Sequence, residues 1–233
     1  MTSPSSLGDA YRAILERIAA AEKAAGRHPG STCLIAVSKT QPADRIEELY
    51  ALGHRDFGEN YVQELLEKAD ILAARGCDEI RWHFIGHLQS KKVKSLLPHV
   101  YCVHSVDSEK LLGEIARRQG EREGGTRMPI FIEINIGDEA SKSGISKSAA
   151  RPLTERSADF PDVELLGLMC VPEANLSEDQ ITARFAELRE LEKECRPFTR
   201  GQLSMGMSHD FELAIVQGAT HIRVGTALFG ARK

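Results

Sequence analysis

Short apolar runs and segments with helical spacing alternate along almost the whole chain. The first run, Leu34 to Val37, is followed by Ile46, Leu49 and Leu52, which share one face of a helix. The alternation continues and predicts strands at 34–37, 55–57, 80–85, 100–103, 129–136, 164–170, 202–204 and 221–224. The predicted helices are 42–52, 61–74, 88–97, 109–118, 149–159, 178–194 and 210–217, with a last short turn at 226–229.

Apolar residues at helical spacing from Leu7 to Ile18 predict an additional helix that ends at Gly26, ahead of the first strand. Eight strand-helix repeats without a low-complexity linker favour an α/β fold, a single (β/α)8 TIM barrel with this extra N-terminal helix. We expect one domain over residues 1–233. An open doubly wound sheet is the alternative, because the same alternation allows it.

The chain is slightly acidic and carries no long block of basic residues. Its 30 Lys and Arg against 34 Asp and Glu give a formal net charge of −4, which argues against nucleic acid and membrane surfaces as partners. No apolar stretch approaches the roughly 18 residues that a membrane helix needs. The five cysteines are an odd number without a C-x-x-C pair, which is typical of buried, reduced thiols. We therefore expect a cytoplasmic protein.

A single lysine, Lys39, follows the first predicted strand, just before the helix start at Pro42. The carboxyl ends of parallel strands are where α/β folds collect ligands and reacting groups, so Lys39 is the first candidate for chemistry. The alternative is an ordinary lysine at a strand end that reaches into solvent.

Two polar loops follow the seventh and eighth predicted strands. Residues 204–208 (Ser-Met-Gly-Met-Ser) offer two hydroxyls and a helix start at Ser208, and 223–226 (Arg-Val-Gly-Thr) offer a cation, a glycine and another hydroxyl. Barrels commonly bind phosphate at these two strand ends, which favours the barrel over the open sheet. The alternative is that Ser208 and Thr226 are ordinary helix caps.

A lysine at the first strand end and a phosphate site at the last two describe a pocket for a phosphorylated aldehyde. Pyridoxal 5'-phosphate fits both features, because a neutral lysine amine can attack its aldehyde.

Seven segments in order along the chain closely resemble the pyridoxal phosphate homeostasis proteins (the YggS/PROSC family). They are LIAVSKT at 34–40, FGENYVQE at 57–64, WHFIG at 82–86, SKSGI at 141–145, GLM at 167–169, LSMGMS at 203–208 and IRVGTALFG at 222–230. The resemblance implies a monomeric or weakly associating barrel like the N-terminal domain of alanine racemase, with pyridoxal 5'-phosphate held as an aldimine on Lys39.

The resemblance also assigns roles to other residues. It implies that Arg223 faces the pyridine nitrogen, that Asn60 lies near the ring, and that Lys142 is a second lysine beside the pocket. The implied phosphate ligands are Ser204, Ser208, Gly225 and Thr226.

The leading functional hypothesis is a non-catalytic carrier that takes part in intracellular pyridoxal phosphate homeostasis and passes the cofactor transiently to apoenzymes. An arginine opposite the pyridine nitrogen weakens the electron sink that catalysis needs. A weak amino-acid racemase is the main alternative, and a phosphosugar-type barrel enzyme with a substrate Schiff base on Lys39 is a third. We expect no metal site, since Gly86 breaks any helix that would bring His83 and His87 together.

Overall fold

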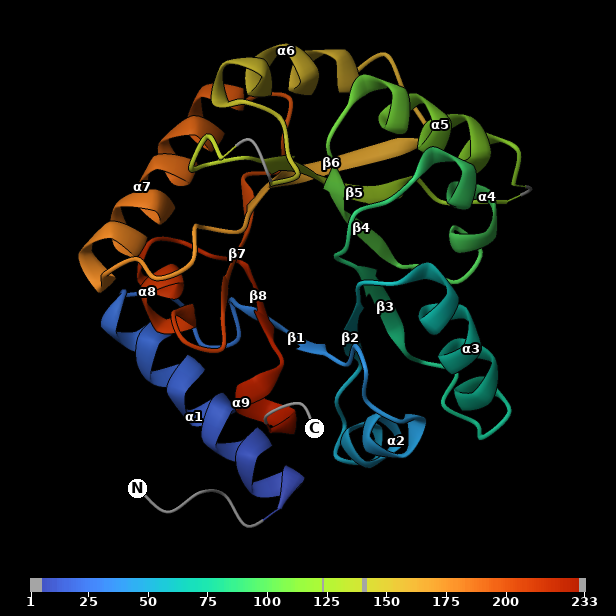
Figure 1. Ribbon diagram of the computed structural model, residues 1–233, viewed down its shortest axis with the longest axis vertical. Coiled ribbons are helices and arrows are strands. Elements are labelled where there is room, and N and C mark those ends of the chain that lie inside the picture. Colours follow the sequence, from blue (N-terminus) through green and yellow to red (C-terminus); the bar gives the residue numbers. More distant parts are fainter. Residues whose placement is uncertain (1–5, 123, 140–141, 231–233) are drawn as a thin grey trace.

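Eight parallel strands close into one barrel in the order β1 to β8, and helices surround it (Figure 1). The computed structural model describes residues 6–122, 124–139 and 142–230. This confirms the predicted (β/α)8 barrel with its extra N-terminal helix and rejects the open sheet, because β1 pairs with β8. The remaining positions of the predicted 1–233 domain lie outside the described residues, and the single domain stays a prediction.

The strands are short and mostly buried. Their bounds are β1 Cys33–Val37, β2 Asp56–Glu59, β3 Arg81–Phe84, β4 Cys102–Val106, β5 Met128–Ile134, β6 Val163–Cys170, β7 Gln202–Met207 and β8 His221–Val224. The α-helices are α1 Leu7–Ala24, α2 Ala43–Ala51, α3 Val62–Ala73, α4 Val93–Leu96, α5 Glu109–Gly120, α6 Lys147–Ser157, α7 Glu178–Cys195, α8 Phe211–Val216 and α9 Thr226–Phe229. No helix in the described ranges is long and apolar enough to cross a bilayer.

The apolar core fills the layer between strands and helices. Phe57, Phe84, Phe185 and Phe211 are among its largest fully buried side chains. The first helix, α1, packs against α8 and α9, so the beginning of the chain covers elements from its end (Figure 1).

One predicted helix is much shorter than expected. In place of a helix over 88–97, a 3-10 turn at Ser90–Lys92 leads into the four-residue α4. Gln89 still has extended backbone, and Leu88 is buried from the preceding loop. The apolar residue at 88 therefore belongs to the loop, and the predicted helix begins too early.

Strands β2 and β4 extend further into polar sequence than the pattern predicted, and β7 continues beyond 204 through Met205, Gly206 and Met207. Polar residues at the carboxyl ends of β2 and β4 are buried and hydrogen-bonded, so they continue the strand where a polar residue normally signals a turn. The Ser105 hydroxyl donates to the Gly86 carbonyl at 2.5 Å, and Glu59 ends β2 as a fully buried carboxylate.

The Glu59 carboxylate is paired with a buried lysine from α3. Lys68 Nζ lies 2.7 Å from Glu59 Oε1 and 2.6 Å from Glu64 Oε1, and it donates to the Ser38 carbonyl at 2.6 Å. Burial raises the pKa of Glu59, while the Lys68 charge opposes that rise. A buried ion pair of this kind stabilises the fold only while both partners are present.

We predict that Lys68→Met lowers the free energy of unfolding by about 3–5 kcal/mol, the usual cost of leaving one partner of a buried pair. The loss should be smaller at pH 5 than at pH 8. Without Lys68 the folded-state pKa of Glu59 rises further above its unfolded value, so the folded protein binds the extra proton and gains stability as pH falls. Chemical denaturation at both pH values measures this.

The matched control is Lys193→Met, which removes an exposed lysine paired with Glu190. Exposed pairs contribute about 0–1 kcal/mol, so this variant should stay close to the wild type. Equal losses for the two variants would contradict the importance of the buried pair.

Candidate functional site

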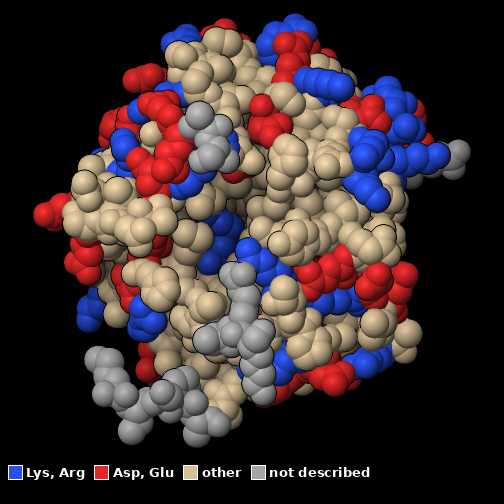
Figure 2. Space-filling model, in the orientation of Figure 1, with Lys and Arg blue, Asp and Glu red and all other residues tan. Residues whose placement is uncertain are grey.

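A cavity of about 290 Å³ opens at the carboxyl ends of the strands. The face of the molecule shown in Figure 2 is hollowed at its centre, where basic side chains lie. Among the predicted site residues, the cavity is lined by Lys39, Asn60, Ser208, Arg223, Gly225 and Thr226. The volume is at the small end of the range for small-molecule pockets.

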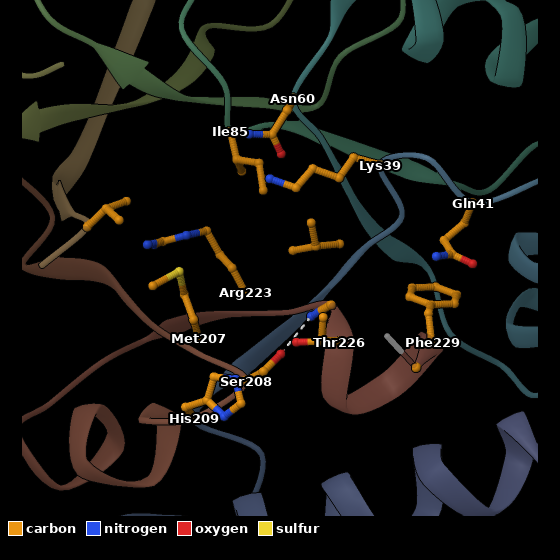
Figure 3. A pocket seen from close by; sticks show the side chains of 14 residues that line it. Lys39, Gln41, Asn60, Ile85, Met207, Ser208, His209, Arg223, Thr226 and Phe229 are labelled. Atoms are coloured by element: carbon orange, nitrogen blue, oxygen red, sulfur yellow. Dashed lines mark hydrogen bonds between the residues drawn. The ribbon is translucent and has the colours of Figure 1, made fainter. Parts of the chain in front are cut away.

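Lys39 follows β1 and points its ammonium group into the cavity, toward Asn60 and Ile85 (Figure 3). The backbone on both sides of it is fixed. Ser38 N donates to the Gly58 carbonyl at 3.0 Å, and Thr40 N donates to Glu64 Oε1 at 2.5 Å. Thr40 also has φ 64°, a left-handed conformation that costs a β-branched residue energy and needs such support. The buried cluster of Lys68, Glu59 and Glu64, called here the Lys68 cluster, therefore holds the segment that carries Lys39.

Asn60 follows β2, and its side chain enters the cavity beside Lys39 (Figure 3). Gly86 allows this position, because a Cβ there would lie only 2.1 Å from the Asn60 carbonyl oxygen. The side-chain Oδ1 of Asn60 is buried and has no hydrogen-bond partner within the described residues. A buried acceptor of this kind suits a ligand that donates a hydrogen bond to it.

Ser208 lies below the start of α9 and joins the two polar loops. Its Oγ accepts a hydrogen bond from the Gly225 amide (Figure 3) and another from the Ala227 amide, both at 3.2 Å. Thr226 is the first residue of α9 and is exposed at the cavity. Backbone amides and hydroxyls converging at a helix start are a typical setting for an anion.

Arg223 lies in β8 and forms the floor of the cavity (Figure 3). The residue is only 4% exposed, and its guanidinium donates to the Cys170 carbonyl and to the Ser204 hydroxyl, both at 2.8 Å. Burial lowers the pKa of Arg223, and the Cys170, Glu133 and Asp210 side chains oppose that shift. Its ordinary pKa lies so far above neutrality that the group stays charged.

The structure corrects two details of the predicted phosphate loops. Ser204 does not line the cavity; it is fully buried inside the barrel, where its hydroxyl contacts Arg223. The helix start predicted at Ser208 is wrong, since α8 begins at Phe211. Gly206 belongs to β7 and has φ 94°, and a Cβ there would approach that of Ala214 to 2.6 Å, so this glycine serves packing.

Sequence reasoning missed several residues near the cavity. Gln41, Met207, His209 and Phe229 line it; Met207 and Phe229 belong to the quoted motifs and Gln41 and His209 follow such motifs, but none of the four was given a role. Glu133 in β5 is nearly buried, and burial together with Asp107 raises its pKa to about 7 against the opposing charges of Arg223 and His87. Its place inside an apolar strand gave no signal.

The remaining predicted groups separate in space. Lys142 lies outside the set of lining residues, with its ammonium 2.8 Å from the Pro172 carbonyl and 3.0 Å from Glu139. His83 is buried inside the barrel, whereas His87 is exposed and pairs with Asp107 at 3.2 Å. These two histidines do not form a joint site.

Comparisons with known proteins point to one family over nearly the whole chain. The profile of the alanine racemase N-terminal domain matches residues 11–233. The pyridoxal phosphate homeostasis protein of Pseudomonas aeruginosa is 43% identical, over 98% of this chain and 96% of its own length. The human protein of the same name is 38% identical, over 100% of this chain and 89% of its own.

Solved structures give the same relationship. PipY of Synechococcus elongatus, solved with PLP bound, is 36% identical with a TM-score of 0.80, over 93% of this chain and all of that one. Alanine racemase of Corynebacterium glutamicum has a TM-score of 0.66 at 14% identity, over 95% of this chain and 61% of that one, which shows a shared fold. The chain therefore belongs to the pyridoxal phosphate homeostasis protein family.

Proposed function

We propose that this chain binds pyridoxal 5'-phosphate in the cavity at the strand ends and holds it for pyridoxal phosphate homeostasis. The observation that carries the proposal is that Lys39, the buried Arg223 and the amide cluster meet at a single cavity. The amide cluster is Ser208 with the Gly225 and Ala227 amides that its hydroxyl accepts from. The cofactor supplies an aldehyde that a lysine amine can bond and a ring that accepts electrons. PipY of Synechococcus elongatus, whose structure has PLP bound, supports the assignment.

The residues of the cavity divide into three roles. Lys39 would bond the aldehyde carbon, and Asn60 would accept a hydrogen bond through its unpartnered Oδ1. Ser208, Gly225 and Thr226 would hold the phosphate at the start of α9. Ser204 is reassigned from the phosphate site to the support of Arg223.

The charge of Arg223 leads us to expect that the protein binds pyridoxal 5'-phosphate without robust catalysis of its own. A guanidinium only donates hydrogen bonds and stays charged, so it would not leave a proton on the pyridine nitrogen. The ring would then withdraw electrons weakly. The described cysteines are free thiols, in keeping with a reducing cytoplasm.

The mouth of the cavity suits release as well as binding. Thr226, His209 and Gly230 line it and are exposed, so a bound cofactor would remain within reach of solvent. We propose that transfer to pyridoxal-phosphate-dependent apoenzymes takes place through transient encounters at this face.

We predict that Lys39→Ala abolishes the visible absorbance of covalently held cofactor, because no other lysine lines the described part of the cavity. Borohydride reduction of the wild-type protein followed by peptide mass mapping should place the label on Lys39. Lys142→Ala is the control and should retain the label. A label on Lys142 would contradict the assignment.

We predict that Ser208→Ala weakens the binding of pyridoxal 5'-phosphate about ten- to a hundredfold, and that of unphosphorylated pyridoxal little. A hydrogen bond to a charged acceptor contributes about 1.5–3 kcal/mol, and only the phosphorylated ligand offers that acceptor. Equilibrium dialysis with both ligands measures the ratio. Ser95→Ala, at an exposed position of α4, is the control. Equal losses for both ligands would exclude the phosphate role.

We predict negligible exchange of the α-proton when the loaded protein is incubated with L-alanine in deuterated buffer. The physical reason is the charged Arg223 at the ring. Mass spectrometry of the amino acid measures exchange, and chiral chromatography measures racemisation. Turnover at about 1 per second or more, the range of ordinary enzymes, would favour the racemase alternative.

A further inference from the structure

A line of polar side chains crosses the barrel interior below the cavity. It starts at Asp56, at the amino end of β2, and ends at Arg223 in the cavity floor. His83 and His104 lie between them and are 1% and 0% exposed, and Ser204 is also 0% exposed. These five residues belong to five strands, β2, β3, β4, β7 and β8.

Each neighbour in this line is within hydrogen-bond distance of the next. Asp56 Oδ1 is 3.1 Å from His83 Nε2, and His83 Nδ1 is 2.9 Å from His104 Nε2. His104 Nδ1 is 2.9 Å from Ser204 Oγ. Arg223 Nη1 donates to the same Ser204 oxygen at 2.8 Å. The His104 ring stacks on Phe131, with centroids 4.6 Å apart, which fixes its plane.

The ends of the line determine where its protons lie. Burial would raise the pKa of Asp56, but the hydrogen bonds from Arg81 and His83 outweigh it and hold that pKa well below its ordinary value. Asp56 is therefore a carboxylate that only accepts, and Arg223 only donates. Burial lowers the pKa of His83 and, more strongly, of His104, so both rings are neutral.

A neutral imidazole has one N–H and one bare nitrogen, so only one arrangement satisfies every link. His83 Nε2 donates to Asp56, which leaves His83 Nδ1 bare to accept from His104 Nε2. His104 Nδ1 is then bare and accepts from the Ser204 hydroxyl. That hydroxyl in turn accepts from Arg223. Any other tautomer places two protons or two lone pairs against each other at some link.

We propose that Asp56, His83, His104 and Ser204 form a one-way hydrogen-bond chain that positions Arg223 in the cavity floor. The chain and the Cys170 carbonyl together use two of the five N–H groups that a guanidinium carries. The other N–H groups are thereby oriented for a ligand. His83, His104 and Ser204 are positioning residues, since none of them lines the cavity.

A metal site is the competing explanation, because His83, Cys102 and His104 offer ligand atoms within 4.8 Å of one another. Two nitrogens on a tetrahedral Zn²⁺, each at about 2.0–2.1 Å, lie about 3.3 Å apart. The distance of 2.9 Å between His83 Nδ1 and His104 Nε2 is shorter than this separation and fits a hydrogen bond. Burial also raises the pKa of the Cys102 thiol well above its ordinary value, which opposes the thiolate that a metal needs.

The hydrogen-bond chain from Asp56 to Ser204 does not require the proposed cofactor, so it can be tested on the ligand-free protein. Only the identity of the ligand that meets Arg223 rests on the proposed function. Nitrogen-15 NMR of histidine-labelled protein at pH 7 should show His83 and His104 as Nε2–H tautomers with hydrogen-bonded bare Nδ1 atoms. An Nδ1–H tautomer or an imidazolium at either ring would overturn the proposal, as would loss of these N–H signals on stoichiometric binding of Zn²⁺.

A pair of variants tests whether the two ends communicate. Asp56→Asn keeps a carbonyl oxygen that can accept from His83, so the tautomer of His104 should be retained. Asp56→Ala removes the acceptor, and the NMR signals should show mixed tautomers at His104, which does not touch residue 56. Both variants lose the ion pair with Arg81, so they differ chiefly in the acceptor. An unchanged His104 in Asp56→Ala would contradict transmission along the chain.

A third variant links the chain to the cavity. Ser204→Ala should weaken binding of pyridoxal 5'-phosphate about three- to tenfold, because Arg223 loses one of its two supporting hydrogen bonds and keeps the one to the Cys170 carbonyl. The variant should also shift the Nδ1 signal of His104 toward that of a free nitrogen. An unshifted His104 signal in Ser204→Ala would overturn the positioning role. If the wild type binds the cofactor, an affinity of the variant equal to that of the wild type would overturn it as well. If the wild type shows the predicted tautomers but binds no cofactor, the proposed function is wrong, whereas the proposed hydrogen-bond chain remains supported.

Discussion

The pairing of β1 with β8 is the constraint on which the site depends. Cys33 to Ala36 pair in register with His221 to Val224, which brings residues nearly 190 positions apart onto neighbouring strands. Because parallel strands end at the same rim, closure places Lys39 beside Arg223 and the start of α9. The lysine, the arginine and the amide cluster meet only in the closed barrel.

Two buried polar clusters support the two cations of the cavity. The Lys68 cluster holds the backbone on both sides of Lys39, and the line of side chains from Asp56 ends at Arg223. Buried polar groups are costly unless each has a partner, and when satisfied they restrict the side chains to one arrangement. In this barrel the cost of burying charge beneath the cavity is offset by hydrogen bonds that fix the cavity's geometry.

Periodicity was sufficient to predict the barrel, because each strand-helix unit carries its own pattern of apolar residues. The position of Lys39 at a strand end could likewise be predicted from local sequence, and Ser208 and Thr226 could be identified as candidates. The burial of Ser204 could not, since its role depends on Arg223 in another strand and on His104 from a third. The Glu59–Lys68 pair was hidden for the same reason, because sequence does not show which polar residues find partners inside.

The packing of α1 against α8 and α9 has a consequence for how the protein is made. Translation produces α1 long before α8 and α9, so the part of its apolar face that packs on them stays uncovered until those helices are made, and only its smaller contact with α2 can form early. Contacts between segments far apart in sequence form slowly, because the long intervening loop must close first. Part of the α1 face therefore docks late in folding, and until then its apolar side chains can associate with other unfolded chains.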